Sequence, residues 1–363
     1  MTPPNTIRIA VMPGDGIGPE VTAVTVAILE RLARRHGLGL VTEELRAGAF
    51  CYRDTGTAMS EETFRRAEAA DAILLGAMGW PGIRYPDGTE LGPQLDLRMR
   101  LGLFAGIRPI KAIPGVRGAL ADPRAANIDL VIVRESTEGL FASRNRGEII
   151  EDREARETLV ITREITEKLS HVSFGLAAER AARLGRPGRV ILVDKANVFR
   201  AFAFMRKVFD EVAAAYPAIA ADHHYVDAMA LDLIRRPWDF DVLPTENMFG
   251  DILSDLAAGL IGGMGFAPSA DLGDGHAVFQ PSHGTAPDIA GQGIANPTAT
   301  LLSAAMMLDW LGTRGAGQGW HDAAQELETA VRGAFAAGLR TPDIGGSDGT
   351  AAVAAAVADR LAG

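Results

Sequence analysis

The sequence of 363 residues contains a single cysteine, Cys51. One thiol cannot form an intramolecular disulfide, so the fold does not need an oxidising compartment. The chain also lacks any run near the roughly 18 consecutive apolar residues that a membrane-spanning helix requires, because Gly, Asp or Arg interrupts each one. Together these absences predict a cytoplasmic protein.

Positive charge is in short supply as well. The chain has 36 Lys and Arg against 46 Asp and Glu, which gives a formal net charge of −10 at pH 7. An excess of negative charge does not favour binding to nucleic acid or to an anionic membrane surface. Hydrophobic residues at 47% and charged residues at 23% are typical of a globular protein. We therefore expect a small-molecule partner rather than nucleic acid or a membrane.

Short β-branched runs alternate with longer helical patterns along the chain. This alternation predicts an α/β fold with a partly parallel sheet, and the lack of a linker indicates that any two domains share strands or interleave. The segment Phe141–Thr162 shows a weak alternation typical of a protruding hairpin or arm, although a solvated surface ribbon fits equally well. The expected strands are Ile7–Val11, Ala72–Leu75, Leu130–Val133, Val190–Val193 and Val242–Leu243, the helices Val21–Arg35, Asn296–Trp310, Asp322–Leu339 and Ala351–Leu361, and the loops Gly262–Gly265 and Leu272–Gly275.

A glycine-rich turn, Pro13–Pro19, lies between the first strand and the first helix. It falls short of the dinucleotide fingerprint, because Pro19 stands where Gly or Ala is needed for close helix packing. We therefore predict no Rossmann site there. A tight strand-to-helix turn explains these glycines, and such a turn can still line a ligand cleft.

Three arginines stand in segments that could face a ligand. Arg98 and Arg108 flank a short apolar stretch, and Arg134 ends an apolar strand, where ligand crevices open in α/β sheets. A guanidinium binds a carboxylate through two parallel hydrogen bonds, so three converging arginines would suit a di- or tricarboxylate. Taken singly, each of them could equally be a surface residue.

Acidic residues form a second candidate cluster. Asp251 and Asp255 are four residues apart and hence on one face of a predicted helix, and Asp227 lies earlier in the chain. Carboxylates at this spacing repel one another unless a cation lies between them, and their oxygens suit Mg²⁺ or Mn²⁺. Helix capping and surface solvation are the alternative. Lys195 follows a predicted strand and could accept a proton if it is buried beside a metal.

Five blocks of the sequence, in this order, resemble the β-decarboxylating dehydrogenases, which include isopropylmalate, isocitrate, homoisocitrate, tartrate and D-malate dehydrogenases. The resemblance implies an isopropylmalate dehydrogenase-like open sheet shared by two domains, not a Rossmann fold. Residues 1–103 and 262–363 would form a cofactor-binding first domain, and residues 104–261 a second domain with the dimer interface, the arm near 141–162 and the metal aspartates. The blocks are Pro13–Glu20, Val193–Asn197, Tyr225–Ala230, Asn247–Ala257 and His283–Ala299.

The resemblance also assigns roles to individual residues. It implies a homodimer with shared active sites, in which catalytic Lys195 and Asp227 reach across to the partner's site and Lys195 assists deprotonation of the substrate hydroxyl. The carboxylates of a malate-type substrate would bind Arg98, Arg108 and Arg134, and Mg²⁺ or Mn²⁺ would bind Asp227, Asp251 and Asp255. The NAD contacts would come from His283, Gly284, Thr285, Ala286, Pro287, Asp288, Ile289 and Asn296.

The pair Asp288-Ile289 favours NAD, because a carboxylate would repel the 2′-phosphate of NADP. Phe141 departs from the family, which usually has a tyrosine there that protonates the enolate carbon. Water or another acid would then serve, or the reaction stops before decarboxylation. Gln94 occupies a place that is apolar in isopropylmalate enzymes, and burying its amide against an isopropyl group would cost about 1–3 kcal/mol.

These observations predict an NAD-dependent and divalent-metal-dependent oxidation, with decarboxylation, of a 2-hydroxy diacid of malate, tartrate or 3-substituted malate type. Two alternatives remain open from the sequence. The first is an isopropylmalate or homoisocitrate dehydrogenase of amino-acid biosynthesis. The second is a binding homologue without turnover, in which Phe141 marks the lost activity. Retention of Lys195 and of the three metal aspartates argues against this second alternative.

Overall fold

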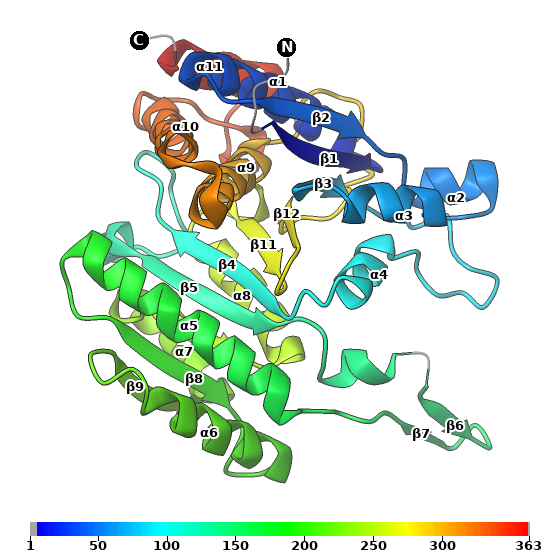
Figure 1. Cartoon of the computed structure of the whole chain (residues 1–363), viewed down its shortest axis with the longest axis vertical. Helices are drawn as coiled ribbons and strands as arrows, with labels where there is room; N and C mark the ends of the chain where they lie inside the picture. Colours follow the sequence, from blue (N-terminus) through cyan, green and yellow to red (C-terminus); the bar gives the residue numbers. More distant parts are fainter. Residues whose placement is uncertain (1–5, 145, 362–363) are drawn as a thin grey trace.

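The computed structural model describes residues 6–144 and 146–361. Ten strands form one mixed sheet in the order β2-β1-β3-β12-β11-β4-β5-β10-β8-β9, shown edge to edge in Figure 1. Strands β6 and β7 pair separately. The bounds are β1 Ile7–Gly14, β2 Leu40–Glu44, β3 Ala72–Ala77, β4 Ala105–Lys111, β5 Asp129–Glu135, β6 Glu148–Ile150, β7 Glu154–Arg156, β8 Arg189–Asp194, β9 Ala220–Tyr225, β10 Val242–Thr245, β11 Pro268–Leu272 and β12 Ala277–Pro281.

The middle of the sheet is antiparallel and its two flanks are parallel. Strand β11 pairs antiparallel with both β12 and β4, and β4 pairs antiparallel with β5. On one side of the β11–β4 pairing lie strands from both chain ends, and on the other side lie strands from the middle of the chain. The sheet is therefore continuous across the boundary between the two parts of the chain, as an open shared sheet requires.

Helices cover both faces of the sheet. Next to the middle strands, α5 packs with α6 while α7 packs with α8, and Figure 1 shows these pairs on opposite faces. The helices are α1 Gly18–His36, α2 Ala49–Thr55, α3 Glu61–Glu68, α4 Pro93–Arg100, α5 Arg163–Leu184, α6 Arg200–Ala213, α7 Val226–Arg235, α8 Asn247–Leu260, α9 Thr298–Leu311, α10 Gln318–Ala336 and α11 Thr350–Arg360.

Side-chain alternation along β1 explains why both faces need helices. Ile9 and Val11 belong to the large core that contains residues of α1 and α9, whereas Ala10 and Met12 pack with Phe64 of α3 on the opposite face. A strand buried on both faces reads as a continuous apolar run, which is how parallel strands covered by helices are recognised.

All five predicted strands and all four predicted helices are present, each within a few residues of its expected ends. One loop prediction is wrong at its first residue, since Leu272 ends strand β11. The predicted strand-to-helix turn at Pro13–Pro19 is present, and Pro19 lies in the first turn of α1. No helix in the described ranges is long and apolar enough to span a bilayer.

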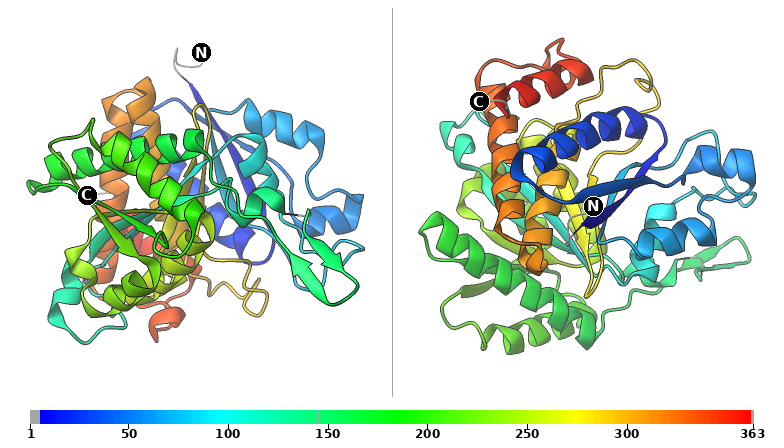
Figure 2. Two further views of the ribbon diagram at one scale, coloured as in Figure 1. Left: turned by 90° about the horizontal axis from the view of Figure 1, so that it is seen from below. Right: turned by 45° about the horizontal axis from the view of Figure 1, so that its top comes forward.

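A hairpin projects from the body of the molecule within the segment 141–162. Strands β6 and β7 form a two-stranded sheet, which projects from the body of the molecule in Figure 1 and in the left view of Figure 2. Ile149, in the middle of β6 and paired with Ala155 of β7, is 79% exposed.

Candidate active site

A cavity of about 210 Å³ lies where the two parts of the sheet meet. Its walls come from strands β3, β4, β5, β11 and β12, from helices α4 and α8, and from the loop after β12. The side chains that carry its chemistry are Gln94, Arg98, Arg108, Arg134, Asp251, Asp255 and His283.

The three arginines predicted to bind carboxylates converge on this cavity, and each is 5–6% exposed. Arg134 donates through Nε to Asn247 Oδ1 at 2.9 Å and forms an ion pair with Asp251. Burial, reinforced by the positive charge of Arg98, lowers the pKa of Arg134 to about 10. Arg134 therefore stays charged at neutral pH, and the cavity presents three guanidinium groups to a ligand.

One carboxylate beneath the arginines was not anticipated from the sequence. Asp271 on β11 is 2% exposed and accepts hydrogen bonds from Arg98 and Arg108 at 3.1 and 3.2 Å. Its signal in the sequence was weak: a single acidic residue among small residues in a strand that the apolar pattern did not reveal.

Asp251 and Asp255 line the same cavity from α8, one helical turn apart. Burial raises the pKa of Asp255, and the negative charge of Asp251 raises it further. Two hard oxygen donors that destabilise one another in this way fit a divalent cation, which would relieve the repulsion. This pair is therefore suited to Mg²⁺ or Mn²⁺.

Lys195 and Asp227 do not line this cavity. Lys195 follows β8 and forms an ion pair with Asp227, whose side chain is 68% exposed at the start of α7. Within the described residues, no three His, Cys, Asp or Glu side chains are placed to hold a metal together. A single chain thus does not bring Asp227 to Asp251 and Asp255, and the contribution of both residues to a partner's site stays a prediction.

The loop from His283 to Ile289 borders the cavity at its other end. Nδ1–H of His283 donates to the carbonyl oxygen of Gly284 at 2.9 Å, and burial lowers the pKa of this imidazole. His283 is therefore neutral, and its buried Nε2 is an acceptor that has no partner among the described residues. Such an atom fits a donor on a bound nucleotide.

The glycine-rich turn fixes this loop in position. The N–H of Ile17 donates to the carbonyl oxygen of Thr285 at 2.9 Å, and Ile289 packs on Ile17 and Val21. Ala286 has φ +39°, a left-handed conformation that non-glycine residues rarely adopt. Gly284, Pro287 and Asp288 are exposed. The turn therefore supports the loop that is predicted to bind NAD.

Asn296 has a different setting from the rest of the predicted nucleotide contacts. Its Oδ1 accepts from the N–H of Thr298 at the start of α9, and its Nδ2 donates to Asp343 at 3.0 Å. Both ends of the amide are engaged within the protein. In this conformation Asn296 holds the helix start, and a contact with NAD would come from its remaining hydrogen-bonding capacity.

Of the two residues predicted to set substrate and product, Gln94 lines the cavity and Phe141 lies beside one of its arginines. The buried Oε1 of Gln94 has no partner in the described part of the chain. The ring of Phe141 lies 5.4 Å from the guanidinium carbon of Arg134. Phe141 is thus close to one of the three arginines predicted to bind the substrate carboxylates.

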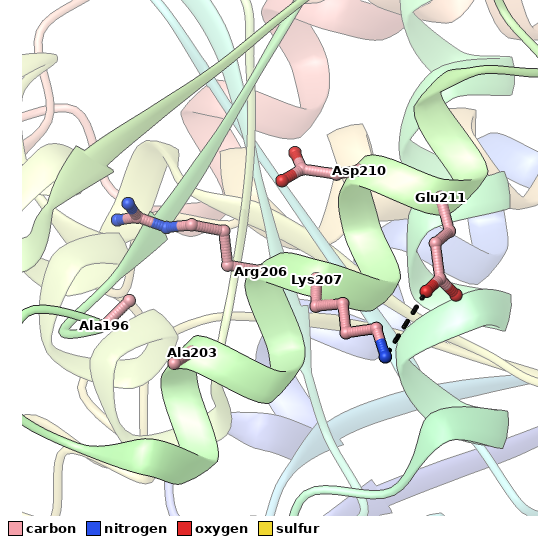
Figure 3. A pocket seen from close by; sticks show the side chains of 6 residues that line it. All are labelled: Ala196, Ala203, Arg206, Lys207, Asp210 and Glu211. Atoms are coloured by element: carbon pink, nitrogen blue, oxygen red, sulfur yellow. Dashed lines mark ion pairs between the residues drawn. The ribbon is translucent and has the colours of Figure 1, made fainter.

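A second hollow, of about 540 Å³, runs along α6 beside the loop that carries Lys195. Figure 3 shows its side chains, with Lys207 paired to Glu211 on the same helix. It is lined by Ala196, Ala203, Arg206, Lys207, Asp210 and Glu211. Its charges are balanced and Arg206 is already bound to Asp194. This hollow lacks the converging cations of the first cavity.

Comparison with known proteins agrees with this geometry. Residues 8–359 match the family described as isocitrate/isopropylmalate dehydrogenase. The chain belongs to this family. It is 42% identical to a 3-isopropylmalate/3-methylmalate dehydrogenase of Methanocaldococcus jannaschii, with 98% of each chain covered. It is also 42% identical to a 3-isopropylmalate dehydrogenase of Xanthomonas oryzae pv. oryzae, covering 95% of this chain and 96% of the relative.

Solved structures agree with the sequence relatives. The isocitrate dehydrogenase from Methylococcus capsulatus superposes with a TM-score of 0.84 at 36% identity, covering 98% of this chain and 99% of that one. A β-decarboxylating dehydrogenase from Thermococcus kodakarensis superposes with a TM-score of 0.78 at 34% identity, covering 98% of this chain and 96% of that one. The chain is accordingly an isocitrate/isopropylmalate dehydrogenase family oxidoreductase, which acts on a CH–OH group with NAD and Mg²⁺ or Mn²⁺ and decarboxylates its product. The predicted family, fold, reaction class and cofactors are confirmed.

Proposed function

We propose that this dehydrogenase oxidises a malate-type 2-hydroxy diacid whose 3-substituent is absent, as in malate, or polar, as in tartrate. The convergence of three buried arginines and two aspartates on one cavity carries the proposal. Gln94 narrows the range of 3-substituents, because its buried Oε1 has no partner among the described residues and requires a hydrogen-bond donor that an isopropyl group lacks. An isopropylmalate or 3-methylmalate substrate is the second candidate, favoured by the names of the 42% identical relatives.

The chain's own side chains would position and activate this substrate. Arg98, Arg108 and Arg134 would hold its carboxylates and exclude rotation about the central bond. Asp251 and Asp255, joined by the partner's Asp227, would hold the divalent cation, which supplies Lewis acidity at the hydroxyl oxygen. The partner's Lys195 would accept the hydroxyl proton. The His283 loop would hold the adenosine end of NAD, whose nicotinamide takes the hydride.

The deciding experiment is a rate assay of NADH formation with Mn²⁺ over D-malate, tartrate, isopropylmalate, isocitrate and homoisocitrate. We expect the highest kcat/KM with malate or tartrate. A preference for isopropylmalate would support the second candidate. Binding of these acids in calorimetry without NADH from any of them would instead indicate a homologue that has lost turnover.

We also propose that the chain works as a homodimer. Large apolar side chains are exposed on α7 and α8, and just before α6, near Lys195 and Asp227, with exposed fractions of 46–59%. A surface of this kind is unusual for a monomer. The side chains are Val198, Phe199, Leu231, Ile234 and Ile252.

A cytoplasmic location likewise stays a prediction that rests on the single cysteine.

The metal assignment predicts the behaviour of Asp251→Asn. Losing one anionic ligand should raise the Mn²⁺ concentration that gives half-maximal turnover by at least about tenfold. Asp359→Asn, on the exposed face of α11, is the control and should leave that concentration unchanged. An unaltered Mn²⁺ titration in Asp251→Asn would show that the metal does not bind there.

The exposed carboxylate of Asp288 predicts cofactor choice. We expect kcat/KM with NAD⁺ to exceed that with NADP⁺ by at least about tenfold, because the carboxylate would lie near the 2′-phosphate. Asp288→Asn should narrow the difference. Equal efficiency of the wild-type protein with both dinucleotides would contradict this prediction.

A further inference from the structure

Asp271 is the most completely enclosed charge at the active-site cavity. Each of its oxygens accepts from one arginine, Oδ2 from Arg98 Nη2 and Oδ1 from Arg108 Nη2, and Oδ2 also accepts from Gln280 Nε2 at 2.8 Å. The facing strand leaves room for it: a Cβ added to Gly106 would come within 3.0 Å of Oδ1. The fold therefore accommodates this carboxylate specifically, with three hydrogen bonds and the space left by the missing side chain of Gly106.

Asp271 is also permanently ionised at physiological pH. Burial alone would raise its pKa, but the positive charges of Arg98, Arg108 and Arg134 outweigh burial and lower the pKa to about 2. It does not line the cavity itself. Its influence on a ligand must pass through the two arginines that it holds, and through its charge.

The charges at the cavity can be balanced explicitly. The three arginines are matched by the carboxylates of Asp251, Asp255 and Asp271, so these six groups are neutral together. A divalent cation on the aspartates of α8 then leaves two positive charges. The Lys195–Asp227 pair is neutral and leaves this balance unchanged wherever it lies. Without Asp271, three positive charges would remain.

We propose that Asp271 is a positioning residue that makes the cavity selective for a substrate with two carboxylates over one with three. It holds Arg98 and Arg108 in place, and its fixed charge offsets one of theirs in a site of low dielectric constant, where like charges repel strongly. A third carboxylate on the substrate would approach this charge without a free guanidinium to receive it. The inference rests on the proposed function and refines its substrate class.

The test compares two probes that differ by one carboxymethyl group, D-malate and isocitrate. Their dissociation constants are measured by calorimetry with Mg²⁺, alongside NADH formation, for the wild-type protein and for Asp271→Asn. We expect Asp271→Asn to tighten isocitrate binding by about 10–100-fold relative to malate binding. Asp271→Asn/Gln280→Glu should restore the wild-type preference, because it returns a negative charge one hydrogen bond away.

Asp241→Asn is the matched control. Asp241 is also buried and bound to two arginines, Arg180 and Arg186, but lies away from the cavity. It should lose comparable stability without any change in the ratio of the two dissociation constants. If Asp271→Asn does not fold, Asp271→Ser, which removes the charge with a smaller side chain, is measured in its place.

The outcomes separate this inference from the proposed function. If Asp271→Asn gains no isocitrate binding beyond that of Asp241→Asn, Asp271 is structural only and the inference is overturned. If the gain occurs although the wild-type protein forms no NADH from any malate-type acid, the proposed function fails while the charge-selective role of Asp271 stands.

Discussion

Phe141→Tyr should accelerate formation of the decarboxylated, protonated product by about 10²–10⁴-fold, the usual contribution of a positioned acid. The ring of Phe141 already lies 5.4 Å from the Arg134 guanidinium carbon, so a hydroxyl on that ring would reach the region where the substrate carbon is protonated. NADH formation should change little, because hydride transfer precedes this step and does not involve the ring.

The measurement is the molar ratio of CO₂ to NADH, together with the amount of protonated product, on the preferred acid of the panel. Phe141→Leu serves as the control, since it removes the ring without adding a donor and should not gain product. A wild-type protein that already releases CO₂ and protonated product in step with NADH, with no gain in Phe141→Tyr, would show that water supplies the proton and that Phe141 only packs.

Mixing two inactive variants, Lys195→Met and Arg134→Gln, should recover about a quarter of wild-type activity, because half of the dimers would be mixed and each would contain one intact site. Alone, Lys195→Met should lose about 10²–10⁴-fold in turnover through loss of the base. Arg134→Gln should lose at least about 100-fold in kcat/KM through loss of a charge-assisted contact to the substrate.

The control mixes Lys195→Met with Asp227→Asn after the same subunit exchange. These two residues are paired within one chain and would reach the same partner site, so no mixed dimer would contain an intact site and no recovery is expected. Recovery in this control, or none in the first mixture, would contradict a site shared between subunits.

The strands predicted from sequence share one property: each is an apolar run buried on both faces. Strand β9, in contrast, carries Asp222, His223 and His224 and lies at the sheet's edge, so its composition resembles a loop. Strand β11 is short, and its apolar pattern is interrupted by Ser269 and by Asp271, which binds Arg98 and Arg108. Periodicity cannot reveal strands whose side chains are chosen by a neighbouring site.

The candidate site, too, has a part that the sequence predicts and a part that it does not. The sequence indicated which arginines and aspartates could act together, and the motif order placed them in a family. The contacts that hold these side chains could not be predicted from their spacing. Arg98 and Arg108 belong to different elements, and both bind Asp271, which is 173 positions from Arg98. The commitment of Asn296 to the start of α9 also depends on tertiary contacts with Asp343.

The return of the chain to the middle of the sheet bears on how the protein is made. Strand β3 finds its neighbour β12 only after residues 277–281 have been synthesised, and β4 must wait equally for β11. Until then the nascent chain carries two apolar strands with unpaired edges, which are templates for wrong pairing. Release from the ribosome before Pro281 should therefore yield an aggregation-prone fragment rather than a folded N-terminal half.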